Sequence, residues 1–342
     1  MTIVLDGTTG ITTPTTSTTG EFVTSVTGYK NRIINGGMAL DQRNAGASQT
    51  ITAAAALAYT VDRWYAYCTG ANVTGQQIAG AYTSSQYRYQ FTGAASVTAI
   101  GFGQRIEAKN CFDLANTTAT LSCYISNSLL TTVTWTAYYA TTTADTFGSL
   151  ASPTVTQIAT GTFTVSSTRT QYTTNISIPS AATTGIQILF TVGAQTSGTW
   201  IIDSVQLEKG STATSFDYRP YTTELALCQR YYQNSYDIGT APATATTIGM
   251  RAIGFGIATV TTGYGAVFFQ VPMRSAPTIA IYDGAGTVSN ISTIPSSSTT
   301  FTNGRAQAAV PFNISTNTFV HQGQAIVAAV LNFIHFTASA EL

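Results

Sequence analysis

The sequence predicts an all-β protein: two β-sandwich (jelly-roll-like) domains joined by a short helix, with an extended N-terminal arm. Many short segments alternate apolar and polar residues, which is typical of half-buried strands. Gly, Asn, Ser and Thr separate these segments at the spacing of sandwich folds. Only one stretch keeps a helical spacing, and 342 residues are enough for two cores.

The composition excludes several partners. Charged residues make up 8% of the chain, the net charge is zero and the pI is about 6.7. This balance gives no electrostatic basis for binding nucleic acid or an acidic membrane. No apolar run approaches the length of a membrane span, and the N-terminus lacks a signal-peptide pattern, so we expect no membrane insertion. So few charges also favour self-association or assembly.

The four cysteines, Cys68, Cys111, Cys123 and Cys228, show no CxxC spacing and have no histidine nearby. We expect small buried thiols in a reducing compartment. A cross-strand bridge between Cys111 and Cys123 is the alternative.

Residues 1–28 form a Thr/Gly/Pro tract with little to bury, in which Pro14 excludes a continuous helix. We interpret it as an extended attachment arm. Residues 29–219 form the predicted jelly roll, and its tryptophans (Trp64, Trp135 and Trp200) are assigned to the core. Its expected strands are 59–67, 119–126, 132–139, 161–166, 185–192 and 199–207.

Residues 220–236 form a helical connector, with a helix over 222–234. Thr222 or Thr223 can cap it and Glu224 lies in its first turn. So short a helix is unstable alone, so its apolar face must pack on a neighbouring subunit or on the chain's own domains. We expect this face to gather three chains, with the oligomer contacts made by Leu225, Cys228, Tyr231 and Tyr232.

Residues 237–342 form the second predicted β-sandwich, with strands at 248–260, 264–271, 277–282, 306–312 and 325–337. Recognition usually lies on loops that a rigid scaffold carries. The loops 282–290 and 302–305 contain turn-forming residues, so they are the candidate receptor-binding tip. Its candidate contact residues are Asp283, Asn290, Asn303 and Arg305.

Charges cluster in residues 201–232. In a regular strand Asp203 shares a face with Ile201, Val205 and Leu207, which places its carboxylate near the core. An unpaired buried charge is costly, so we expect a structural pair with an arginine. Arg63 is the first choice, followed by Arg32 or Arg43. A calcium site on Asp203 and backbone carbonyls is the alternative.

Five motifs occur in order. They are YKNRIINGGMALDQR at 29–43, VDRW at 61–64, VQLEKGSTATSFDYRP at 205–220, ELALCQRYY at 224–232, and the C-terminal stretches FQVPMRSAPTIAIYDGAG (269–286) and FTASAEL (336–342). In these segments the chain resembles a modular group of bacteriophage tail and tail-fibre proteins. The resemblance implies a jelly roll like a carbohydrate-binding module, followed by a trimeric terminal domain on a virion. Such a protein is assembled in the bacterial cytoplasm, with residues 1–28 contacting other virion proteins.

We expect no enzyme, no cofactor and no metal. Most carboxylates lie singly, His321 and His335 are the only histidines, and no hydrolase or phosphate-binding motif is present. A homotrimeric tail fibre that binds host surface glycan is the first hypothesis. A purely structural capsid-decoration or baseplate protein is the second, and a polysaccharide depolymerase the third. Tyrosine faces stack on sugars, and the candidate contacts are Tyr65, Tyr67, Tyr87, Tyr89 and Tyr138.

Overall fold

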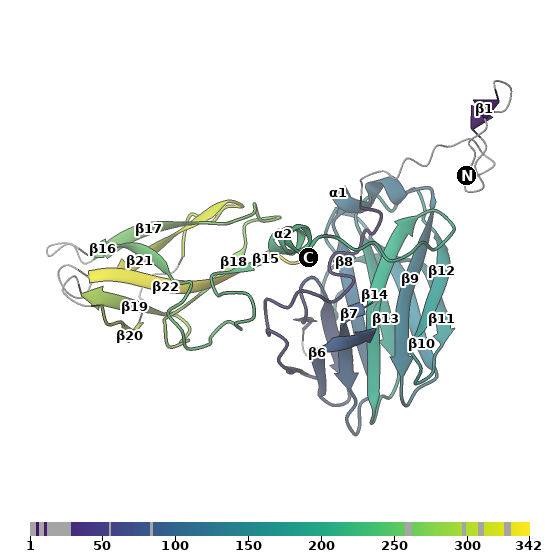
Figure 1. The fold of residues 1–342 in the computed structure, drawn as a ribbon, viewed down its shortest axis with the longest axis horizontal. Helices are drawn as coiled ribbons and strands as arrows, with labels where there is room; N and C mark the ends of the chain where they lie inside the picture. Colours follow the sequence, from purple (N-terminus) through teal and green to yellow (C-terminus); the bar gives the residue numbers. More distant parts are fainter. Residues whose placement is uncertain are drawn as a thin grey trace.

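The computed structural model describes residues 5–6, 10–11, 29–54, 56–82, 85–256, 262–295, 299–306, 311–324 and 330–342. Two β bodies lie side by side and meet beside the helix α2 (Tyr221–Gln229) (Figure 1). The predicted all-β class is confirmed, since the other helical segments in the described ranges are the short α1 (Ala108–Cys111) and η1 (Phe112–Leu114). The domain boundaries stay a prediction.

The first body is a sandwich of two six-stranded sheets in which neighbouring strands are antiparallel. The first sheet has the order β11 (Val155–Thr164), β10 (Thr132–Ala140), β13 (Ile186–Val192), β8 (Ala99–Ile106), β5 (Tyr65–Thr69) and β4 (Ala58–Tyr59). The second sheet has the order β12 (Thr170–Ser177), β9 (Thr118–Asn127), β14 (Thr199–Lys209), β7 (Ser85–Thr92), β6 (Val73–Tyr82) and β3 (Gln49–Ile51).

Aromatic rings fill the space between the two sheets. Phe102 stacks on Trp64 with ring centroids 4.6 Å apart, and Phe91 stacks on Trp200 at 5.1 Å. Both tryptophans are fully buried and Trp135 nearly so, which confirms the core assignment. All four cysteines are buried free thiols, so the alternative of a Cys111–Cys123 bridge is wrong.

The strand expected over 59–67 is interrupted. Thr60 N–H donates to the carbonyl of Trp64 at 2.8 Å, which closes a tight turn between β4 and β5. Arg63 lies in this turn in the left-handed region, with φ 73°. Few side chains other than glycine adopt this conformation without strain, so strong contacts elsewhere must hold Arg63 there.

A bulge in β14 overturns the predicted Asp203–Arg63 pair. The register shifts between Asp203 and Gln206, with Ser204 at φ 49°. Trp200 and Ile202 therefore face the core before the bulge, and Val205 and Leu207 after it. Asp203 follows the core residue Ile202 and so points away from the core, and the bulge turns Val205 and Leu207 to the opposite face from Asp203. Asp203 pairs there with Arg169, whose Nε and Nη2 donate to its two carboxylate oxygens at 2.9 and 2.5 Å.

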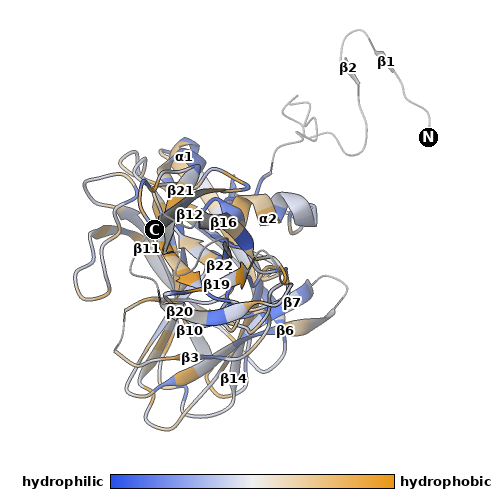
Figure 2. Ribbon diagram, turned by 90° about the vertical axis from the view of Figure 1, so that its left-hand side faces the viewer, coloured by the Kyte–Doolittle hydropathy of each residue, from blue (hydrophilic) through white to orange (hydrophobic). Residues whose placement is uncertain are grey.

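The second body is built around β22. The main sheet runs β15 (Tyr232–Asn234), β22 (Val330–Ser339), β19 (Asn290–Pro295) and β20 (Thr302–Ala306), while β16 (Arg251–Gly256) and β18 (Thr278–Tyr282) also pair with β22. β17 (Thr262–Phe268) pairs with β21 (Thr318–Gln324). Orange, hydrophobic segments gather where β19 and β22 lie (Figure 2). Ile291, Ile334, Phe319 and Phe336 belong to this core.

The predicted tip is not at the far end of the second body. The loop after β18 leaves the sheet beside His335, and β19 re-enters beside Phe333, so the loop lies half-way along β22. Asp283 is fully buried, and its Oδ1 accepts from the N–H groups of Ala285 and Thr287, so it holds its own loop instead of facing a ligand. Residues 302–305 are not a loop but part of β20.

The apolar side of the helix α2 packs against other parts of the same chain. Cys228 and Tyr231 are fully buried in a cluster with Ile34 and Leu40 of the first body. Tyr232 lies beyond the helix, in β15, and is also buried. The expectation that this face gathers neighbouring subunits is therefore wrong, because the face is covered inside one chain. The helix also ends earlier than predicted, at Gln229.

Within the described ranges of residues 1–28, β1 (Leu5–Asp6) pairs with β2 (Gly10–Ile11). The rest of the predicted arm lies outside the described residues. In the described part of the chain, no helix is both long enough and apolar enough to cross a membrane.

Candidate functional site

Two tyrosines lie flat on the outer face of the first sheet. Tyr65 and Tyr67 of β5 stand opposite Gly103 and Gly101 of β8 in the antiparallel ladder. A Cβ atom at Gly101 would come within 2.1 Å of the Tyr67 ring, and one at Gly103 within 2.5 Å of the Tyr65 hydroxyl. The glycines are therefore required for the rings to cover β8.

A hollow of about 170 Å³ opens beside these rings. Tyr138 of β10 lines it from one side, and Gln187 and Leu189 of β13 from below. Tyr65, Tyr67 and Tyr138 thus come together from strands far apart in the sequence, but Tyr65 is 2% exposed, so its prediction as a surface contact is wrong and the half-buried Tyr67 and Tyr138 stay the candidate contacts here. We call this site the tyrosine hollow.

Arg105 fixes the wall of the tyrosine hollow. Its Nε donates to Oε1 of Gln187 at 3.0 Å, its Nη2 to the carbonyl of Gly148 at 2.9 Å and its Nη1 to the carbonyl of Leu342 at 2.8 Å. All three guanidinium nitrogens are occupied, so the arginine organises the wall and is not available as a free cation.

The hydroxyls of Tyr65 and Tyr67 are neutral. Burial raises the pKa of Tyr65 far above its ordinary value, and burial followed by the neighbouring Tyr138 raises the pKa of Tyr67. Protonated phenols donate and accept hydrogen bonds. Ring faces beside neutral hydroxyls and an amide suit the C–H faces and hydroxyls of a sugar.

The remaining predicted glycan contacts lie elsewhere. Tyr89 is 2% exposed and stacks on Phe102 inside the sandwich, so its prediction as a surface contact is wrong. Tyr87 lines a different hollow of about 390 Å³, together with Gln77 and Tyr221. Sequence reasoning missed the two glycines and Gln187. The alternation Gly101–Phe102–Gly103 was the available signal, since glycine is rare inside strands unless something approaches closely.

Arg63 lies at the junction of the two bodies. Its Nη1 forms an ion pair with Glu341, and its Nη2 donates to the carbonyl of Arg105 at 2.6 Å. The guanidinium carbon also lies 3.5 Å from the centroid of the Tyr231 ring, a cation–π contact. These contacts hold Arg63 in its left-handed conformation, and they explain why it is not the partner of Asp203.

Glu341 is shared by two arginines. Arg43 donates to its Oε1 at 3.0 Å, in addition to the contact from Arg63. Arg274 donates to the backbone carbonyls of Ala340 and Glu341 at 3.0 and 3.2 Å. We call Arg43, Arg63, Arg274 and Glu341 the junction cluster.

A second ion pair, buried on the side of Glu107, lies at the same junction. Glu107 receives hydrogen bonds from Nε and Nη2 of Arg230 at 3.0 and 2.7 Å, and from the Tyr231 hydroxyl at 2.9 Å. Burial favours a higher pKa, but these hydrogen bonds outweigh it and hold the pKa of Glu107 below its ordinary value. The motifs at 29–43, 61–64, 224–232 and 336–342 therefore meet at the junction, where they make structural contacts.

The buried carboxyl group of Asp62 makes the stability of the protein depend on pH. Its buried carboxylate accepts from N and Nε2 of Gln42 at 3.2 and 2.7 Å, and desolvation raises its pKa from 3.8 to about 6. Between these values the folded protein keeps a proton that the unfolded chain releases, so the contribution of Asp62 to stability falls as pH rises through this window. A difference of this size corresponds to about 3 kcal/mol.

We therefore expect Asp62→Asn to gain stability relative to the parent as pH rises from 4 to 7. Urea unfolding of both proteins across this range gives the difference between their free energies of unfolding. Groups that titrate in both proteins contribute equally and drop out of this difference. Parallel stability curves would exclude a raised pKa for Asp62.

Over the described residues, no group of three or more His, Cys, Asp and Glu side chains could hold a metal ion. A calcium ion on Asp203 would have to displace Arg169. His335 packs inside the second body, where Ser235 Oγ and Nδ1 lie 2.9 Å apart. Asn290, Asn303 and Arg305 stay predictions as recognition residues.

No family model and no curated protein matches the chain. The chain is similar over part of its length to solved structures. A structure described as "CBM4 structure and function" is 17% identical, with a TM-score of 0.33, and the match covers 52% of this chain and 98% of that one. The enzymatically active domain of bacteriophage CBA120 tailspike protein 4 is 16% identical, with a TM-score of 0.32, over 53% of this chain and 22% of that one. A putative sugar-binding protein from Bacteroides thetaiotaomicron is 12% identical, with a TM-score of 0.33, over 53% of this chain and all of that one.

Proposed function

We propose that the chain is a bacteriophage virion protein, a homotrimeric tail fibre that attaches the particle to host surface glycan without catalysis. The tyrosine hollow carries the glycan-binding part of this proposal, because the half-buried Tyr67 and Tyr138 line it together beside the amide of Gln187. The virion part, including the trimer and contacts of residues 1–28 with other virion proteins, is supported by the motif resemblance.

The lining of the tyrosine hollow favours binding over cleavage. Glycoside hydrolysis commonly needs two carboxylates that flank the bond to be broken. Among the described residues that line this hollow, the polar groups are tyrosine hydroxyls, an amide, a serine and the occupied Arg105. Such groups orient a sugar through hydrogen bonds.

We expect Tyr67→Ala and Tyr138→Ala each to weaken glycan binding by about tenfold or more, which corresponds to about 1.4 kcal/mol. Each variant removes a ring that stacks on the sugar. A glycan array identifies the ligand and calorimetry measures its affinity. Tyr264→Ala, which removes an exposed tyrosine of the second body, is the matched control and should bind like the parent.

Two outcomes would redirect the proposal. Purified protein that binds no glycan and does not compete with host adsorption favours a purely structural capsid or baseplate role. Shortened host polysaccharide after incubation favours a depolymerase. Antibody against residues 237–342, followed by electron microscopy, shows which part of a particle carries the protein.

A further inference from the structure

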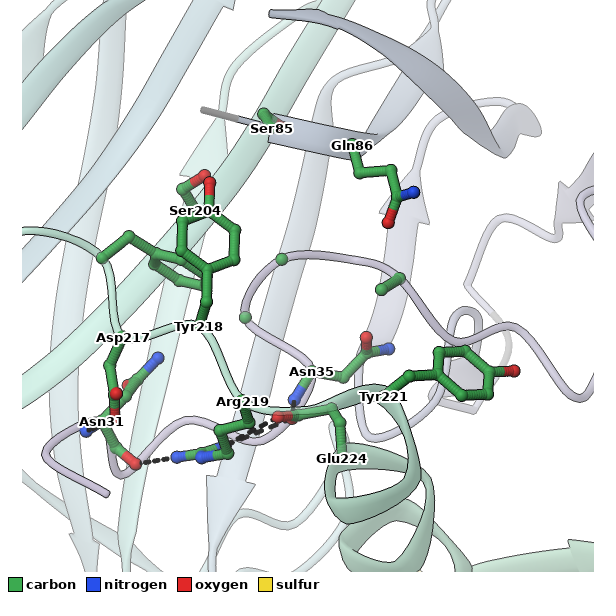
Figure 3. Close-up of a pocket in the computed structure, with 14 residues that line it drawn as sticks. Asn31, Asn35, Ser85, Gln86, Ser204, Asp217, Tyr218, Arg219, Tyr221 and Glu224 are labelled. Carbon is green, nitrogen blue, oxygen red and sulfur yellow. Dashed lines mark hydrogen bonds and ion pairs between the residues drawn. The ribbon is translucent and has the colours of Figure 1, made fainter. Parts of the chain in front are cut away.

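We propose that the first body carries a second carbohydrate site, on its other sheet, which binds a single neutral sugar residue. The site is a hollow of about 170 Å³ between β7, the bulge of β14, the loop at 35–39 and the segment 216–224 (Figure 3). We call it the bulge pocket. The inference does not depend on the proposed function, because it concerns different strands and a different set of residues.

The floor of the bulge pocket is a fixed backbone crossing. The N–H of Val205 donates to the carbonyl of Gly36 at 2.9 Å, and Nδ2 of Asn31 donates to the carbonyl of Val205 at 2.9 Å. A Cβ atom at Gly36 would lie 2.1 Å from the Val205 oxygen, so only glycine allows this approach. The pocket is therefore preformed.

Aromatic rings form one wall of the bulge pocket. Phe216 and Tyr218 meet edge to face with centroids 4.9 Å apart, and Tyr218 remains 60% exposed. Figure 3 shows Tyr218 next to Ser204 on one side and Gln86 reaching in from β7 on the other. A ring face opposite an amide is a common arrangement for holding a sugar.

The charged side chains around the bulge pocket are already hydrogen-bonded within the chain. Nη1 of Arg219 contacts both oxygens of Glu224 at 3.2 and 3.1 Å, and Asp217 accepts from the N–H groups of Lys30 and Asn31 at 2.8 and 3.2 Å. A carboxylate has about four lone-pair sites, so each keeps acceptor capacity for hydroxyl donors. Two carboxylates beside an occupied arginine disfavour an anion, and their spare acceptors suit the hydroxyl donors of a neutral sugar. The small volume favours one ring over a long chain.

Gly37 provides a way to fill the bulge pocket. A Cβ atom at Gly37 would lie 3.5 Å from the Phe216 ring, an ordinary contact, so Gly37→Leu should enter the space without a backbone clash. Gly193→Leu is the matched control, because a Cβ atom there meets nothing within 4 Å. Tyr218→Ala is a second variant that removes a largely exposed ring, and it covers the case in which Gly37→Leu does not fold.

The test is saturation-transfer NMR with methyl glycosides of hexoses, 6-deoxyhexoses and N-acetylhexosamines. At least one glycoside should bind the parent, Gly193→Leu and Tyr67→Ala alike, and should lose at least tenfold in affinity with Gly37→Leu or Tyr218→Ala. If the parent binds no glycoside, or if binding is lost only with Tyr67→Ala, the inference is overturned. The second result leaves the tyrosine hollow intact as a binding site, so the two proposals fail separately.

Discussion

Replacing Glu341 by alanine is expected to lower the free energy of unfolding by about 3–5 kcal/mol, the cost of leaving a buried charge without its partner. Arg63 is 1% exposed, and Glu341 is its ion-pair partner in the described structure. Arg43 loses its contact at the same time. Urea unfolding measures the change.

Asp113→Ala is the control for this prediction. Asp113 pairs with Arg32 at the surface, where both side chains are about one third exposed, so its removal should cost about 1 kcal/mol or less. Replacing Arg63 and Glu341 together by methionine should restore much of the stability, because no charge is then left unpaired. Equal losses for Glu341→Ala and Asp113→Ala would show that the junction cluster is not a buried network.

Arg169→Ala is expected to lower the free energy of unfolding by about 3–5 kcal/mol. The reason is that Asp203 is 1% exposed and loses the partner that donates two hydrogen bonds to it. Arg169 also stacks on the Tyr124 ring, with its guanidinium carbon 3.7 Å from the centroid. A double-mutant cycle with Asp203→Asn measures the coupling directly.

The same cycle with Arg63→Met in place of Arg169→Ala should give a coupling energy near zero. A large coupling of Asp203 to Arg63 would instead restore the pairing predicted from the sequence. If a chelator lowers the stability of the parent protein, the result would point to the calcium alternative, because Arg169 needs no metal to hold Asp203.

The prediction that Asp203 meets an arginine is confirmed, but the predicted partners are wrong, because Arg169 holds its carboxylate. Arg63, Arg32 and Arg43 pair with other carboxylates. The argument assumed a regular strand, in which positions two apart share a face. Ser204 breaks this alternation by adopting φ 49° in a bulge, and serine carries no signal for that conformation. The desolvation argument was sound, because Asp203 is buried and paired, whereas the geometry depended on one backbone angle.

The helix was predicted from its spacing, and the structure confirms a helix there with an apolar side that must be covered. Spacing cannot identify the cover, because Ile34 and Leu40 lie almost two hundred positions earlier and reach α2 only after the sandwich has formed. Tyr232 was assigned to the helix because aromatic residues suit both a helix and a strand, and pairing with β22 placed it in β15.

For the tyrosine hollow, alternation about the core residue Trp64 is sufficient to place Tyr65 and Tyr67 on the outer face. Tyr89 was misplaced because tyrosines were counted as surface candidates without regard to the face of β7 on which Phe91 also lies. These two tyrosines meet Tyr138 and Gln187 only because β13 pairs with both β10 and β8 in the sheet. The local sequence pattern does not encode this strand order.

The junction cluster has a consequence for synthesis on the ribosome. Arg63 and Glu341 are 278 positions apart, so the whole first body emerges long before the residue that neutralises its buried guanidinium. Until β22 has formed and carried Glu341 back, the buried Arg63 of the first body lacks this ion-pair partner. The Arg63–Glu341 ion pair therefore forms only after both bodies have folded. Each body has its own core, but completing the first body during synthesis depends on the second.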